Sequence, residues 1–156
     1  MEKSDKTLLE RLADKVPGLS GYRAREDRRT SDKRLREFIA GRIDALRAQL
    51  DDRKLALTDA GRLDDLETVG RLQRELQAMG DSIRYASYGY SGMFDQLKID
   101  DPELQKLYQQ DLSVLDALET LERSFKDSSE GMSGARQALT ALQNSLDARR
   151  TLFEAP

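Results

Sequence analysis

Six carboxylates are the side chains of this 156-residue sequence best suited to bind a metal ion. They fall into two clusters, Asp64, Asp65 and Glu67, and Asp100, Asp101 and Glu103. Carboxylate oxygens bind Ca²⁺ and Mg²⁺, but neither cluster has the ligand spacing of an EF-hand loop. Acidic residues are also favoured in the first turn of a helix, where the helix dipole stabilises them. We therefore expect helix starts at both places and no metal site.

The absence of histidine and cysteine removes most other catalytic chemistry from the chain. Without histidine there is no imidazole base, no Ser-His-Asp triad and no Glu-x-x-His di-iron motif. Without cysteine there is no disulfide, no thiolate nucleophile and no cysteine zinc site. The glycines of segment 89–92 are not followed by the Lys-Ser/Thr of a phosphate-binding loop. The sequence therefore predicts a protein that is not an enzyme, uses no cofactor and has no small-molecule substrate.

Four aromatic side chains gather within ten residues, whereas only five others occur in the whole chain. They are Tyr85, Tyr88, Tyr90 and Phe94. Tyrosines on a glycine-containing loop suit a partner-binding surface, since each ring offers contact area and a hydrogen-bonding tip. The same rings could instead close one end of the fold. We expect both roles, with Tyr85 and Phe94 directed inward and Tyr88 or Tyr90 directed outward.

A basic segment precedes the first long apolar stripe. Its seven cations are Arg23, Arg25, Arg28, Arg29, Lys33, Arg34 and Arg36, and with three interleaved acids the net charge is +4. Such a patch can contact phosphates of nucleic acid or of an anionic membrane. It can equally be a solvated helix with internal ion pairs, such as Asp32 with Arg36 at i,i+4. The interleaved acids and the lack of stacking aromatics favour the second interpretation.

The elements that position these residues are helices, because the composition is that of a helical protein. The chain contains 24 Leu and 15 Ala against three Val and four Ile, and 35% of its residues are charged. Leu, Ala and the long polar residues favour helix, whereas sheets are built mainly on β-branched and aromatic residues. A sheet architecture is therefore excluded.

Hydrophobic periodicity predicts a short helix over 7–16 and a long one from about 35 to 60. Pro17-Gly18 ends the first. The stretch 20–34 is almost entirely polar and offers no apolar face to bury, so the long helix starts near Ser20 or at Thr30-Ser31. Leu63 and Leu66 fall on the opposite side of that helix from Leu57, which predicts a break at Gly61 with a left-handed C-cap.

Three further helices complete the pattern. Their apolar stripes are Leu63, Leu66, Val69, Leu72, Leu76, Met79 and Ile83; then Leu104, Leu107, Tyr108, Leu112, Leu115, Leu118, Leu121 and Phe125; then Met132, Ala135, Leu139, Leu142, Leu146 and either Leu152 or Phe153. Asp101-Pro102 is a helix start signal. We predict an all-α antiparallel bundle of about four long helices over residues 20–156, with a short N-terminal accessory helix in residues 1–19.

These features favour a non-catalytic helical adaptor or scaffold that binds another protein or itself through apolar helix faces. The alternative is a binder of anionic surfaces, nucleic acid or acidic membrane, through segment 23–36, and a small-ligand or metal-binding bundle is a distant third. The N-terminal residues lack the apolar segment of a signal peptide, and no run approaches the roughly 18 apolar residues of a membrane span. We therefore expect a soluble cytoplasmic protein.

Overall fold

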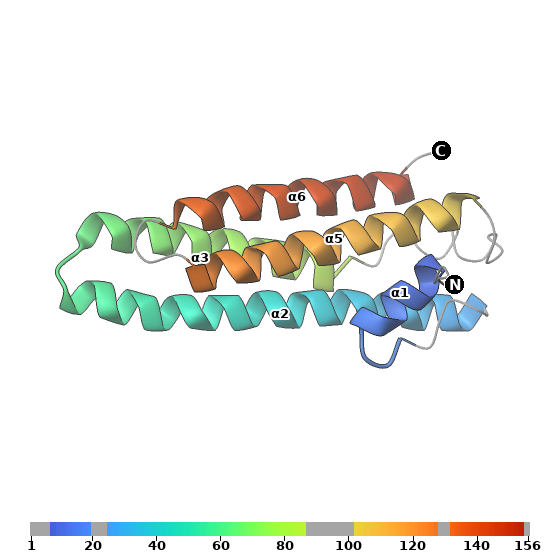
Figure 1. The fold of residues 1–156 in the computed structure, drawn as a ribbon, viewed down its shortest axis with the longest axis horizontal. Coiled ribbons are helices and arrows are strands. Elements are labelled where there is room, and N and C mark those ends of the chain that lie inside the picture. The colour runs from blue at the N-terminus through green and yellow to red at the C-terminus, as the bar shows by residue number, and fades with distance from the viewer. Residues whose placement is uncertain (1–6, 20–24, 87–101, 128–131, 155–156) are drawn as a thin grey trace, which may run out of the picture.

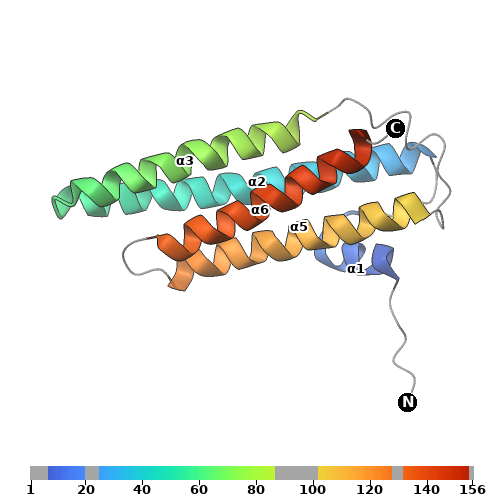
Figure 2. The ribbon, with the colours of Figure 1, turned by 90° about the horizontal axis from the view of Figure 1, so that it is seen from above.

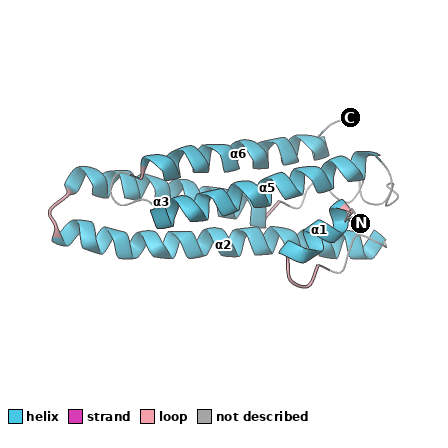
Figure 3. Cartoon of the chain, viewed as in Figure 1, coloured by secondary structure: helices cyan, strands magenta, loops and turns pink. Residues whose placement is uncertain are grey.

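The computed structural model describes residues 7–19, 25–86, 102–127 and 132–154 of the chain. Every regular element in those ranges is a helix (Figure 3). The helices are α1 (Leu8–Lys15), α2 (Arg25–Asp59), α3 (Leu63–Arg84), α5 (Pro102–Asp127) and α6 (Ser133–Glu154). Consecutive long helices alternate in direction, so the predicted all-α antiparallel bundle is confirmed (Figure 1).

The bundle consists of two antiparallel hairpins, α2–α3 and α5–α6, packed against each other. Figures 1 and 2 place α2 beside α3 and α5, and α6 beside α3 and α5. Neighbours across the two hairpins, α2 with α5 and α3 with α6, therefore run parallel. Helices α3 and α5 therefore occupy opposite corners of the bundle.

The chain turns between α2 and α3 at Gly61, where the sequence predicts the break, and the turn is a complete Schellman motif. Gly61 has φ +68°, a left-handed conformation that glycine adopts without a Cβ penalty. Its N–H donates to the carbonyl of Thr58 at 3.1 Å, and the N–H of Arg62 donates to the carbonyl of Leu57 at 3.0 Å. These bonds satisfy carbonyls that the end of the helix leaves without partners.

The core lies along the predicted stripes. The stripe of α5 is buried throughout, and that of the last helix is buried from Met132, just before α6, to Leu146, while Leu152 is partly buried. On α2, the buried stripe consists of Leu35, Ile39, Ile43, Leu46, Leu50 and Leu57. Gly80 allows α3 to approach α2 closely, because a Cβ at this position would lie 3.4 Å from Ile43 Cγ2.

The sequence leaves the start of α2 open between two positions: residues 25–30 are helical, which excludes the start at Thr30-Ser31, while Ser20 lies outside the described residues. Two other expectations are wrong. Ser31 and Asp32 are buried, so the polar stretch does have a face in the core, one made of polar side chains. Leu63 is 72% exposed, because at about 100° per residue it lies on the opposite side of α3 from the buried Leu72 and Leu76.

Helix α1 is the predicted accessory element, and it packs on α5. Thr7 caps its start by accepting from the N–H of Glu10 at 3.2 Å. Lys15 Nζ donates to Glu119 of α5 at 2.9 Å, and this hydrogen bond holds the pKa of Lys15 above its ordinary value. After α1, Arg34 of α2 donates to the carbonyl of Gly18 at 2.9 Å, which ties the first turn of the chain to the bundle.

Candidate functional site

The tip of the α2–α3 hairpin, here the residues from Lys54 near the end of α2 to Glu67 near the start of α3, exposes large apolar side chains. Among the described residues, the large hydrophobic side chains that are strongly exposed are Leu55, Leu63 and Tyr85, at 67%, 72% and 71%. The two leucines both belong to the tip, one on the last turns of α2 and one at the start of α3. Exposed apolar residues that gather at one place on a surface mark candidate interaction sites.

The tip is exposed because α5 and α6 are too short to cover it. Figure 2 shows α2 and α3 continuing past the end of α5 and the start of α6. Arg53 marks the boundary on α2: its guanidinium donates to the carbonyl of Phe125 at 3.3 Å and lies 2.9 Å from the sulfur of Met132. Beyond Arg53, α3 is the helix packed beside α2, and Phe125 of α5 still lines a hollow together with Ala56 and Leu57.

Two hollows flank the tip. The first, here called the α2–α5 groove, is lined by Gln49, Asp52, Arg53, Ala56, Leu57, Ala60, Arg62 and Phe125. The second lies between α2 and α3 and is lined by Lys54, Thr58, Leu63, Leu66, Glu67, Gly70 and Arg74. Both combine an apolar floor with charged side chains at the edge, which is the usual composition of a surface that packs against another protein.

The charges near the tip are arranged in short-range pairs. Arg62 contacts Asp65 at 2.5 Å across the first turn of α3, and Arg71 lies 3.9 Å from Glu67. Asp52 lies on α2, exposed, beside the α2–α5 groove. The groove thus presents an acid on its α2 side and a guanidinium, that of Arg62, at the turn.

The basic segment does not form one exposed patch. Arg23 lies outside the described residues, and Arg25 and Arg28 belong to the first turn of α2. Arg29, Lys33 and Arg34 are exposed, and Arg34 is bound to the carbonyl of Gly18. Arg36 is only 8% exposed, so its guanidinium does not take part in a surface patch as the sequence suggested.

Arg36 instead belongs to a buried network that joins all four long helices, here called the core ion network. Arg36 Nε donates to Asp32 at 2.9 Å, as the i,i+4 spacing predicts, and its Nη1 donates to the carbonyl of Arg84 at the end of α3 at 2.9 Å. Arg149 of α6 donates to Asp111 of α5 at 2.6 Å and also pairs with Asp32. The side chains of Asp32, Asp111 and Arg149 are at most 2% exposed.

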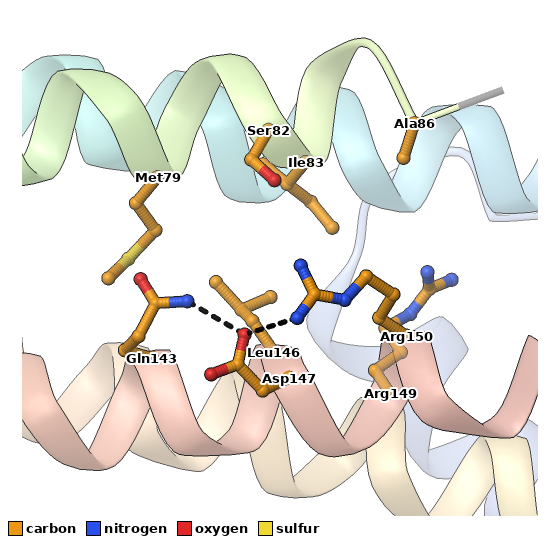
Figure 4. A pocket seen from close by; sticks show the side chains of 9 residues that line it. All are labelled: Met79, Ser82, Ile83, Ala86, Gln143, Leu146, Asp147, Arg149 and Arg150. Carbon is orange, nitrogen blue, oxygen red and sulfur yellow. Dashed lines mark hydrogen bonds and ion pairs between the residues drawn. The ribbon is translucent and has the colours of Figure 1, made fainter. Parts of the chain in front are cut away.

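A small pocket lies beside this network, between α3 and α6. Figure 4 shows its walls, which are formed by Met79, Ser82, Ile83, Ala86, Gln143, Leu146, Asp147, Arg149 and Arg150. The Asp147 carboxylate accepts from Gln143 at 3.0 Å and pairs with Arg150 at 3.4 Å. Both partners of that carboxylate belong to α6 itself.

Tyr85 is the one member of the aromatic group within the described residues. It follows the last turn of α3 and is 71% exposed, so the expectation that it points into the core is wrong. Tyr88, Tyr90 and Phe94 lie outside the described residues. Next to Tyr85, Arg84 donates to Asp44 at 2.8 Å, and this hydrogen bond holds the pKa of Asp44 below its ordinary value.

The acidic clusters are described only in part, since Asp100 and Asp101 lie outside the described residues. Asp64 and Asp65 lie in the first turn of α3, and Glu103 lies in the first turn of α5, as the helix dipole favours. In the described ranges no three acidic side chains come close enough together to hold a metal ion. Among the described helices, none combines the length and the apolar composition that crossing a membrane requires.

Sequence reasoning missed the exposed tip and most of the core ion network. A signal for the tip was present, because Leu55 lies off the stripe of its helix. No local signal announced the pair of Arg149 with Asp111, because the two residues are 38 positions apart. Comparison with protein families, with curated proteins and with solved structures finds no match to this chain.

Proposed function

We propose that this protein is a non-catalytic helical scaffold that binds protein through the tip of its α2–α3 hairpin. The observation that carries the proposal is the pair of large apolar side chains exposed on the projecting end of this hairpin, Leu55 at 67% and Leu63 at 72%. Covering an exposed leucine contributes roughly 1.5–3 kcal/mol when the burial is complete. Two such residues on a rigid hairpin form a small apolar anchor for a partner.

The rigidity of the hairpin supports this function. The Schellman turn at Gly61 fixes the angle between α2 and α3, and the ion pair of Arg62 with Asp65 braces the first turn of α3. A preformed surface binds without paying for the ordering of its own residues. A cytoplasmic location remains a prediction from the sequence.

The aromatic group remains a second candidate surface, and the exposure of Tyr85 favours it. Tyr85 follows the last turn of α3, whereas the tip includes the first turn of that helix, so the two surfaces can be tested separately. The binding roles of Tyr88, Tyr90 and Phe94 stay predictions.

Site-specific photo-crosslinking in cells that naturally make the protein tests the proposal. Benzoylphenylalanine is placed at Leu55, Leu63 or Tyr85, and at Gln77, an exposed position on the same helix α3, as the matched control. We expect a discrete protein adduct from positions 55 and 63 and none from Gln77. Adducts from Tyr85 alone would assign binding to the aromatic group and contradict the role of the tip.

A further inference from the structure

We propose, building on the interaction function of the tip, that the α2–α5 groove binds the same groove of a second copy of this chain. The two α2 helices lie antiparallel across a twofold axis near Ala56. Each tip then fills the space beside its partner's α2 where α5 has ended. A twofold contact of this kind uses one surface twice and closes the assembly at a dimer.

Continuity with the interface inside the bundle indicates that a helix occupies the groove. Along α2, the face toward α5 carries Arg42, which pairs with Glu122, and then Arg53, which reaches the carbonyl of Phe125. The next turns of the same face carry Ala56 and Ala60, both exposed, above the buried Leu57. A helix in the groove therefore continues the track of α5, and the alanines let it approach closely.

The direction of the second copy follows from the shape of the molecule. All of the bundle lies on one side of the tip along the long axis (Figure 2). A parallel second copy would place its own bundle alongside the first. An antiparallel copy places its bundle beyond the tip of the first copy, so that only the two hairpin ends overlap. This limited overlap matches a groove that lies at the end of α2.

The charges of the groove are complementary to themselves in this arrangement. With the axis at Ala56, residue 52 of one copy faces residue 60 of the other, next to its Arg62. The contact therefore brings Asp52 of each copy near Arg62 of its partner, twice by symmetry. Opposite charges at the edge of an interface fix its register and orientation.

The expected dimer is weak and reversible. An overlap of about three helical turns per copy covers less than the about 800 Å² per partner that is typical of stable complexes. We therefore expect sedimentation velocity to show a monomer–dimer equilibrium that shifts to monomer on dilution.

Disulfide trapping tests the register directly, because the chain contains no cysteine of its own. Ala56→Cys places the new thiol at the twofold axis, and Ala48→Cys places it at an exposed position on the same helix as a matched control. Under mild oxidation we expect a covalent homodimer from Ala56→Cys and little from Ala48→Cys. Equal trapping of the two variants, or a monomer at the highest soluble concentration, would overturn the proposal.

Charge reversal provides a second, independent readout. Asp52→Arg should weaken the dimer about tenfold or more, since it sets two guanidiniums against each other, and Asp52→Arg with Arg62→Asp should restore it. Arg62→Asp also removes the ion pair of Arg62 with Asp65, but an aspartate can supply the side-chain cap that the N-cap of α3 lacks. Failure of the rescue would overturn the predicted pairing. A monomeric protein whose residue 63 crosslinks to a different protein would overturn self-association and leave the interaction function of the tip intact.

Discussion

Replacing Arg149 by methionine removes the cation that joins α6 to both α5 and α2 in the core ion network. Asp32 keeps its hydrogen bond from Arg36, but Asp111 loses the guanidinium that lies 2.6 Å from it while its side chain stays buried. Removing one partner of a buried ion pair typically costs about 3–5 kcal/mol, because the remaining charge has neither water nor a counterion. That loss is a large part of the about 5–15 kcal/mol by which a domain is stable.

Urea denaturation followed by circular dichroism measures the effect. With a slope of about 2 kcal/mol per molar, a loss of about 4 kcal/mol moves the unfolding midpoint down by about 2 M. Arg150→Met is the matched control, since its side chain is 49% exposed and its pair with Asp147 is a surface pair. A surface change of this type stays within about 0.5 kcal/mol.

A double variant separates the loss of the charge pair from the loss of packing. Arg149→Met with Asp111→Leu removes both charges and leaves the pair of Asp32 with Arg36 in place. Replacing a buried ion pair by apolar side chains is often neutral, so the double variant should recover most of the loss. A single variant within about 1 kcal/mol of wild type, or a double variant no more stable than the single, would refute this account.

Three further substitutions test local features by the same denaturation assay. Gly61→Ala should cost roughly 1–2 kcal/mol of stability, because the φ of Gly61 is +68°. Gly41→Ala, in the interior of α2 with open space around it, should stabilise the protein by about 0.5–1 kcal/mol. A change of stability in the same direction for both variants would contradict the predicted cap. The lowered pKa of Asp44 contributes stability above the ordinary carboxyl pKa that is lost as pH falls through the lowered folded value, so Asp44→Asn should reduce the loss of stability on acidification; an unchanged pH profile would argue against it. Tyr85→Ser should change the free energy of unfolding by no more than about 0.5 kcal/mol, because the ring is exposed; a larger loss would show that it packs against the fold.

The helices and the first turn could be predicted because their signals are local. The spacing of apolar residues fixes which face of each helix is buried, and the change of phase between Leu57 and Leu63 locates the turn at Gly61. The same reasoning placed Leu63 in the core, because steps of three residues link it to Leu66 and Val69. Those steps drift around the helix, so that Leu63 lies about 180° away from the buried Leu72.

The core ion network could be predicted only in its local part. The pair of Asp32 with Arg36 follows from i,i+4 spacing, but the same pattern is typical of an exposed helix surface. Its burial depends on Arg149, which is 117 positions away from Asp32. From the sequence alone, a polar stretch such as 20–34 is therefore interpreted as a solvent-exposed helix surface, because the tertiary partners of its charges lie far away in the sequence.

The division into two hairpins also sets the order in which the chain can fold. Each hairpin joins helices that are neighbours in the sequence, so its closing loop is short and its contacts form early at a small entropic cost. The contacts between the hairpins join residues that are far apart in the sequence, such as Arg149 and Asp32, which are 117 positions apart. If they form after the rate-limiting step, they control how fast the folded protein opens rather than how fast it forms. The core ion network then controls the rate of unfolding, and through it the lifetime of the folded bundle.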